Sequence, residues 1–272
     1  MLVAYFSVGV TEKGYVDVEV ELNLGSRAGH SSVPKPGLGV LSKLGAVAHK
    51  AEQRQMTMYL NDATVEMCQV VSREFGFLGK FILRNIRFFW PIARPVLNRT
   101  IIASLFRTTS TVTMFNGGIK HNVLPSQGRL IINHRIHPED NISKVLERDK
   151  SLMLDEHMTV TALRPAEPHP VAPFDETAVG YHSVKVAIEQ TFGPDKVLVV
   201  PGLFVAASDS RHYLRLTDAC YRFLPTCITL ADAGRYHGPD EKISLENYEQ
   251  TINFYINLIR NADSKSVTEL YH

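Results

Sequence analysis

The chain has 272 residues, of which 44% are hydrophobic and 21% are charged, which is usual for a globular protein with a buried core. Its 29 Lys and Arg residues nearly balance 28 Asp and Glu residues, and the net charge of +1 excludes the strongly basic character of a nucleic-acid-binding protein. The three cysteines, Cys68, Cys220 and Cys227, have neither metal-finger spacing nor the number that a disulfide framework needs. We interpret them as free thiols, with a Cys220–Cys227 disulfide as the alternative.

The first six residues, Met1 to Phe6, are predicted to form a short buried strand. They lack the basic segment and the small-residue cleavage site of a signal peptide, so the compartment is left open. Because the chain starts inside a core strand, we expect it to be a truncated form of a longer protein.

Alternating and helical patterns predict the next part of the fold. Residues 16–24 alternate apolar and polar side chains, as a half-buried strand does, and a loop rich in Gly, Ser and Pro follows. The later elements are a helix over about 38–51, strands at 109–115 and 129–136, a helix over 141–153 and a strand at 158–163. This β-α-β-β-α-β order predicts a ferredoxin-like α+β sandwich.

Residues 52–107 form a long insertion between the first helix and the second strand of this sandwich. Its core, Phe75 to Phe106, mixes large apolar residues with arginines, and Pro91 and Pro95 are predicted to break it into at least two helices. No stretch reaches ~18 uncharged apolar residues, so a membrane span is not expected. Two interpretations remain, a helical cap on its own domain and a basic amphipathic surface for lipid or for a fatty acyl chain.

The remaining chain alternates helix and strand, which predicts the edge of an α/β sheet. Four prolines between Pro165 and Pro173 indicate a hinge before it. The expected elements are a helix at 177–191, a strand at 197–200, an apolar stretch at 220–230 and a helix at 244–262. We therefore predict a strand of a catalytic α/β domain at 1–14, the sandwich at 15–164 and the C-terminal portion of the catalytic domain at 165–272.

Three local patterns contain residues suited to chemistry. His30 lies in a Gly-His-Ser-Ser-Val-Pro loop; Asn122 precedes a strand that contains Arg135; and Ser-Asp-Ser-Arg, ending at Arg211, is followed by Tyr-His-Gly-Pro around His237. An Asn amide and an Arg guanidinium suit a carboxylate or an oxyanion, and a His before a Gly-Pro turn suits a metal or a substrate. Taken singly, each also fits an ordinary loop or surface residue.

In their order and spacing, these patterns resemble the zinc-dependent family that contains aminoacylase, succinyl-diaminopimelate desuccinylase and vacuolar carboxypeptidase S. Within it they are most similar to the branch of N-fatty-acyl-amino-acid synthase/hydrolases. The resemblance covers nearly the whole chain, and four motifs in order are far more specific than any one. It implies a lid or dimerisation domain of the β-α-β-β-α-β type, inserted in a two-zinc catalytic domain.

The resemblance implies roles for three residues of the lid. His30 is similar to the histidine that reaches a neighbouring active site and stabilises the oxyanion. Asn122 and Arg135 are similar to the pair that holds the carboxylate or carbonyl of the substrate. A homodimer formed through the lid domain, with a small N-acyl amino acid as substrate, is the partner set that the resemblance implies.

It also implies roles for three residues nearer the C-terminus. Arg211 is similar to the arginine that binds the free carboxylate of the amino-acid product, and Asp209 is expected to brace its loop. His237 is similar to the last zinc ligand. The family pattern usually reads Gly-Thr-Asp-Ser-Arg, so Ala207-Ser208 is a mild departure, since Ser can donate and accept as Thr does.

In the family, the other zinc ligands, the bridging aspartate and the glutamate base lie upstream of the part that this chain matches. The full-length enzyme is expected to hold two zinc ions, whereas His237 alone cannot hold a catalytic zinc, which needs about three protein ligands. We therefore expect hydrolysis or synthesis of N-acyl, chiefly N-fatty-acyl, amino acids by the full-length enzyme and no turnover by these 272 residues. The alternatives are a non-catalytic dimerising isoform and a lipid-surface binding module. The resemblance implies full-length relatives that are secreted or vacuolar/lumenal, while the compartment of this chain is left open.

Overall fold

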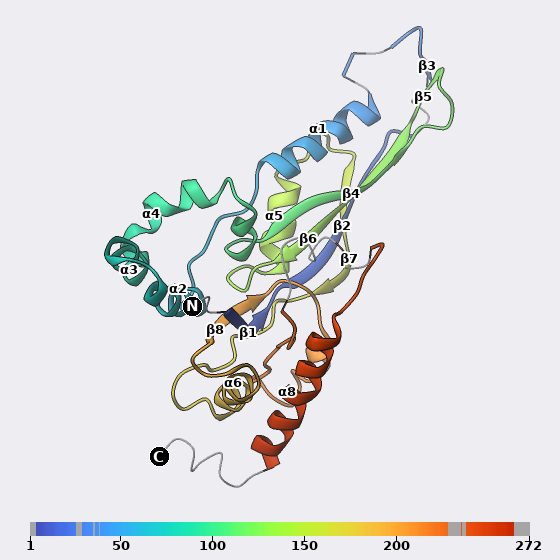
Figure 1. The fold of residues 1–272 in the computed structure, drawn as a ribbon. Coiled ribbons are helices and arrows are strands. Elements are labelled where there is room, and N and C mark those ends of the chain that lie inside the picture. Colours follow the sequence, from blue (N-terminus) through green and yellow to red (C-terminus); the bar gives the residue numbers. More distant parts are fainter. Residues whose placement is uncertain are drawn as a thin grey trace.

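Two main hydrophobic cores organise the chain, each built from one β-sheet and the helices that pack on it (Figure 1). The structure, a computed structural model, describes residues 4–25, 29–34, 36–37, 39–227, 235 and 238–263. His237 lies outside the described residues. Its predicted role as a zinc ligand therefore stays a prediction.

The larger sheet, the lid sheet, has the strand order β4-β6-β2-β7, and all its neighbouring strands are antiparallel. Its strands are β2 (Gly14–Asn23), β4 (Thr109–Gly117), β6 (Gln127–Ile136) and β7 (Met158–Ala166). The first and third strands along the chain thus lie at the centre, as a β-α-β-β-α-β chain places them. The element order predicted from the sequence is confirmed.

One face of the lid sheet is covered by α1 (Val40–Gln53) and α5 (Ile142–Lys150). Every second residue of β2 from Val16 to Leu22 is buried beneath them, because successive side chains of a strand point to opposite faces. At one end of the sheet, Gly128 lets α1 come close. A Cβ atom there would lie 2.9 Å from Cδ1 of Leu44.

A second, two-stranded parallel sheet pairs β1 (Ala4–Glu12) with β8 (Val197–Phe204). Helices α6 (Val179–Phe192) and α8 (Leu245–Asp263) pack beside it around their own core. The segment between β7 and α6, predicted as a hinge, is fastened along β1, where Ala172 N–H donates to the Val10 carbonyl at 2.7 Å. The predicted strand and helices of this part are confirmed.

The insertion contains α2 (Asp62–Val71), α3 (Phe77–Arg84), α4 (Ile86–Leu97) and two short 3-10 turns, Ser72–Glu74 and η2 (Ile101–Leu105). The prediction that Pro91 and Pro95 break the helices is wrong, since both lie inside α4 and the break falls at Asn85. Trp90 and Leu97 of α4 pack against a small core around Phe106, which holds the helix together despite two lost backbone hydrogen bonds. No helix among the described residues has the length and apolar character to cross a bilayer.

Helix α2 does not behave as a cap on the lid alone. Its Ala63 is buried in the second core, and the helix lies against β8 rather than on the lid sheet. The insertion therefore starts by bridging the two cores before it turns outward into α3 and α4 (Figure 1).

Candidate functional site

His30 and Asn122 meet on a two-stranded arm that extends from the end of the lid sheet (Figure 1). The arm consists of β3 (Gly29–His30) and β5 (Val123–Leu124), in which His30 pairs with Val123. Ser31 N–H donates to the Asn122 carbonyl at 3.2 Å and extends the pairing by one residue. Two loops that are about ninety residues apart in the sequence are thus brought together.

The His30 imidazole is exposed, and its own loop orients it. Ser32 N–H donates to His30 Nδ1 at 3.2 Å, and Ser32 Oγ lies 2.7 Å from the same nitrogen. Because a backbone N–H can only donate, Nδ1 acts as the acceptor and the neutral ring carries its proton on Nε2. His30 thereby presents an Nε2–H donor to the outside, which is the group that a developing oxyanion requires.

Asn122 is only partly exposed, and its Oδ1 is buried without a hydrogen-bond partner among the described residues. A buried amide oxygen left unpaired costs about 1–3 kcal/mol. A substrate N–H or a donor from a second subunit would satisfy it.

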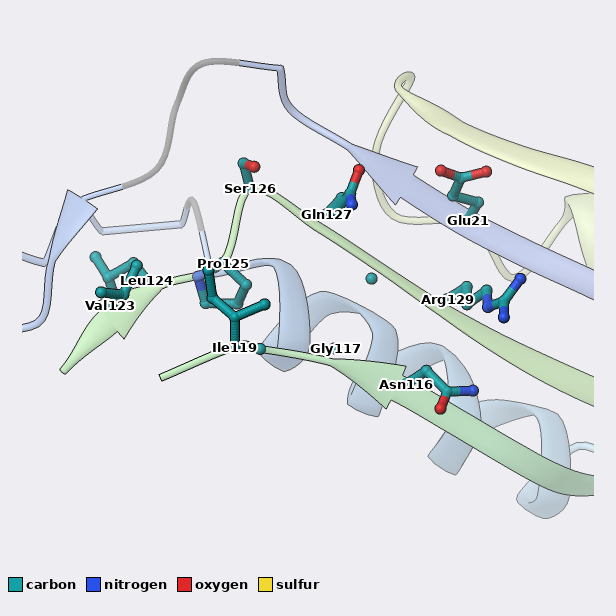
Figure 2. A pocket seen from close by; sticks show the side chains of 12 residues that line it. Glu21, Asn116, Gly117, Ile119, Val123, Leu124, Pro125, Ser126, Gln127 and Arg129 are labelled. Atoms are coloured by element: carbon teal, nitrogen blue, oxygen red, sulfur yellow. The ribbon is translucent and has the colours of Figure 1, made fainter. Parts of the chain in front are cut away.

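A cavity of about 490 Å³ lies where the arm joins the lid sheet (Figure 2). Figure 2 shows Val123, Leu124 and Ile119 at its arm end, and Glu21 and Arg129 on the strands at its other end. None of the predicted site residues lines it. We therefore assign the cavity to the root of the arm rather than to the site itself.

Arg135 lies at the other end of β6, on the open face of the lid sheet, with its guanidinium 4.8 Å from the centre of the Tyr15 ring. It forms no ion pair with a described residue; the nearby carboxylate of Asp17 is instead paired with Arg164 at 2.5 Å. Eight residue steps separate Arg135 from the start of β6, or about 26 Å of extended strand. The expected approach of Asn122 to Arg135 is therefore not found within one chain.

Asp209 and Arg211 belong to a short 3-10 turn, η3 (Asp209–His212), in which both are exposed. Among the described residues, the bonds that hold this turn come from Ser208 and Ser210, and the bracing role of Asp209 stays a prediction. Ser208 N–H donates to Glu12 Oε1 at 2.8 Å and Ser210 Oγ donates to Oε2 at 3.1 Å. The buried carboxylate of Glu12 thus holds the turn from its inner side, and the Arg211 side chain is exposed.

Glu12 is the centre of a buried polar cluster that sequence reasoning missed. Its carboxylate, 2% exposed, also accepts a 2.9 Å hydrogen bond from Arg222 Nε, and Arg222 in turn donates to His169 Nδ1. Burial lowers the pKa of His169, so the ring stays neutral and accepts from the guanidinium. The only available signal was a charged Glu-Lys pair directly after an apolar strand.

A second buried group has the connectivity of a Ser-His-Asp triad. Ser110 Oγ lies 2.9 Å from His134 Nδ1, and His134 Nε2 lies 2.8 Å from Asp149 Oδ2. His134 and Asp149 are fully buried, so no substrate can reach them. We interpret this chain as a hydrogen-bonded tie between the lid sheet and α5.

No group of three His, Cys, Asp or Glu side chains among the described residues is arranged to hold a metal ion. The residues present in the described part of the chain therefore do not fit the zinc site that the resemblance implies. They instead supply the Nε2–H donor of His30 on the arm, the unpaired amide oxygen of Asn122 and the outward-facing Arg211 on the η3 turn.

Comparison with known proteins identifies the family of this chain. Residues 10–157 match the family described as peptidase dimerisation domain, M20_dimer. The chain is 37% identical over 261 residues to mouse N-fatty-acyl-amino acid synthase/hydrolase PM20D1, covering 94% of this chain and 51% of that protein. It is 32% identical to the probable carboxypeptidase S-like 2 of Dictyostelium discoideum, covering 94% and 48%. The chain thus spans about half the length of the curated relatives it matches.

Solved structures agree at the level of the fold. The M20 family metallo-carboxypeptidase Sso-CP2 of Sulfolobus solfataricus aligns with a TM-score of 0.59 at 14% identity, over 94% of this chain and 60% of that chain. Human carnosine dipeptidase 1 aligns with a TM-score of 0.56 at 13% identity, over 96% and 58%. The resemblance inferred from the motifs is confirmed, and the chain belongs to the M20 peptidase family and contains its dimerisation domain.

Proposed function

We propose that the chain is part of a zinc-dependent amidohydrolase that hydrolyses, or by reversal forms, N-acyl amino acids with a long fatty acyl group. The observation that supports this most is the similarity, over nearly the whole chain, to proteins named N-fatty-acyl-amino acid synthase/hydrolase. We also propose that residues 1–14 and 165–272 belong to its catalytic domain and residues 15–164 to its lid.

In this proposal each described site residue has one task. His30 Nε2–H donates to the amide oxygen of the substrate as negative charge develops on it. Arg211, held by the Glu12 cluster, binds the free carboxylate of the amino-acid part, and Asp209 lies beside it on the same turn. Asn122 and Arg135 hold the carboxylate or carbonyl of the substrate through their N–H groups, and the unpaired Asn122 Oδ1 accepts from a substrate N–H.

The zinc ions are proposed for the full-length protein, with His237 as one ligand. When bound, they polarise the amide carbonyl and lower the pKa of the attacking water. Because the described residues supply no ligand set, we propose that the 272 residues alone do not turn over substrate.

A homodimer through the lid domain would complete the site. Asn122 and Arg135 lie too far apart within one chain to share a ligand, so one of them would have to act on a site that the second subunit helps to form. Strand β4 is an edge of the lid sheet, and its Met114 and Phe115 are about half exposed. An exposed apolar edge strand is the surface on which a second lid would pair.

Activity assays of the full-length protein test the proposal. We expect hydrolysis of N-oleoyl amino acids to exceed that of N-acetyl amino acids, and a clear preference for the acetyl series would refute the fatty-acyl assignment. His30→Ala should lower kcat about 100-fold, as loss of an oxyanion donor does. Arg211→Ala should chiefly raise KM, because its carboxylate contact is already made in the ground state.

Subunit complementation tests the dimer. If His30 of one subunit serves the site of the other, mixing the impaired His30→Ala and Arg211→Ala proteins should restore activity at low substrate concentration, since one site in each mixed dimer is intact. The alternative, a non-catalytic dimerising isoform, predicts that the 272-residue chain forms mixed dimers with the full-length protein on size-exclusion chromatography while remaining inactive. Absence of mixed dimers would remove that alternative.

A further inference from the structure

Helices α3 and α4 present an apolar surface that nothing in the described chain covers. They lie at the outer edge of the molecule, away from the β3–β5 arm and from α8 (Figure 1). The exposed fractions are Phe77 89%, Phe81 52%, Phe88 79%, Ile92 69%, Val96 67% and, on η2, Ile101 87%. We refer to these six residues as the insertion face.

The insertion face is distinct from the side of α4 that packs inward. Ile86, Trp90 and Leu97 follow one side of the helix and contact the rest of the chain, as the buried Ile86 and the core around Phe106 show. Residues 88, 92 and 96 are spaced by four and form a stripe on the opposite side. Helix α4 is therefore apolar on two sides, and only one of them has a partner.

The charged side chains that α3 and α4 themselves carry are all cationic. From Phe75 to Pro138 the sequence contains no Asp or Glu. Lys80 and Arg84 are exposed on α3 and, by helix geometry, lie beside the Phe77–Phe81 row. Arg87 pairs with Asp62, whereas Lys80, Arg84 and Arg99 form no ion pair with a described residue. Arg94 lies on the inward side of α4, where it lines a cavity with Trp90 and Arg107.

We propose that the insertion face docks on an anionic phospholipid surface, with its apolar side chains at the boundary between headgroups and acyl chains. An apolar stripe bordered by Lys and Arg is the pattern of helices that lie in the plane of a membrane interface. The one-sign charge favours an anionic surface, to which each Lys or Arg is attracted at short range. The same charge disfavours a second copy of this chain as the occupant, because two such faces would repel each other. This surface is independent of the proposed amidohydrolase activity.

Vesicle co-sedimentation tests the proposal with the purified chain. We expect binding to mixed phosphatidylcholine–phosphatidylserine vesicles, weaker binding as salt is raised, and little binding to phosphatidylcholine alone. Phe88→Ser/Ile92→Ser and, separately, Lys80→Glu/Arg84→Glu should each lower the partition coefficient at least about tenfold. The matched controls are Leu245→Ser, an equally exposed apolar residue on α8, and Lys150→Glu/Lys242→Glu, and both should bind as the parent does.

The only tryptophan of the chain, Trp90, lies on the inward side of α4, so a Trp90→Phe/Phe88→Trp variant is needed to place a fluorophore on the insertion face. Docking through the insertion face should quench the fluorescence of this variant when the vesicles contain brominated lipids. Absence of vesicle binding, binding without quenching of the Trp90→Phe/Phe88→Trp variant, or face variants that bind as tightly as the parent would each overturn the proposal. So would self-association that Phe88→Ser/Ile92→Ser abolishes in a chain that does not bind vesicles, because the occupant would then be a second copy.

Discussion

Glu12→Gln should separate the role of the buried cluster from that of the exposed site residues. The substitution keeps the shape of the side chain but removes the charge that faces Arg222, whose own side chain is 5% exposed. Breaking a buried ion pair by removing one partner costs about 3–5 kcal/mol, because the other charge remains buried. Arg222 retains a 2.8 Å hydrogen bond to the Cys220 carbonyl, so we expect a loss near the lower limit, about 3 kcal/mol.

Urea unfolding of the purified chain measures this loss, and limited proteolysis locates it. Because Glu12 holds Ser208 and Ser210, the variant should be cleaved faster by trypsin after Arg211, which directly follows Ser210 in the η3 turn. Glu156→Gln, at an exposed position, is the control and should change stability by less than about 0.5 kcal/mol. An unfolding free energy within about 1 kcal/mol of the parent, with unchanged cleavage at Arg211, would refute the assignment of Glu12 as the anchor.

Two further substitutions test the packing and the pH response. Gly128→Ala should destabilise the chain by about 1–3 kcal/mol in urea unfolding, since its Cβ would press on Leu44, whereas Gly45→Ala, which meets nothing within 4 Å, should be neutral or stabilising. Burial lowers the pKa of His137 to about 4, below its unfolded value of about 6.5. The stability that the buried neutral ring contributes is therefore fully present above pH 6.5 and is lost as the pH falls towards 4. His137→Phe should flatten the stability profile over that window, and an unchanged slope would contradict the assignment.

The lid sheet was predictable because its strands obey a single local rule. Residues 16–24 alternate in polarity, and the structure buries every second residue of that strand under α1 and α5. The order of helices and strands then limits the topology, since a β-α-β-β-α-β chain has few ways to bury one face of four strands. The strand order observed is the one that this reasoning favours.

Long-range contacts explain what the sequence could not predict. Helix α2 has its own cap at Asn61 and an ordinary helical pattern, and nothing local indicates that Ala63 packs into the second core. Pro91 was expected to end a helix, but the loss of one backbone bond is offset when neighbouring turns pack against a core. In both cases tertiary contacts decide the outcome.

The candidate site was likewise predictable from the sequence only in part. The motif order located His30, Asn122 and Arg211, yet it gave no indication of what holds them. The pairing of His30 with Val123 depends on two loops that are far apart in the sequence. Glu12, which fixes the Arg211 turn, is nearly two hundred residues from it, so only the fold brings the two together.

Three consecutive side chains at the junction of β1 and β2 fasten the main parts of the chain to one another. Thr11 Oγ1 donates to the His169 carbonyl at 2.8 Å, and Glu12 holds the Ser208 turn. Lys13 Nζ donates to the carbonyls of Ser104 and Arg107 at the end of the insertion, at 2.6 and 2.7 Å. Burial lowers the pKa of Lys13 to about 8, which still leaves it protonated at neutral pH, as these two bonds require.

This junction has a consequence for how the parts can move. Three segments are each bonded to residues 11–13, where the chain enters the lid sheet. They are the segment between β7 and α6, the η3 turn that carries Arg211, and the insertion. The arm, by contrast, shares none of the bonds of residues 11–13 among the described residues. A substitution at positions 11–13 should therefore disturb all three anchored segments together, whereas one on the arm should leave them in place, because none of their bonds passes through it.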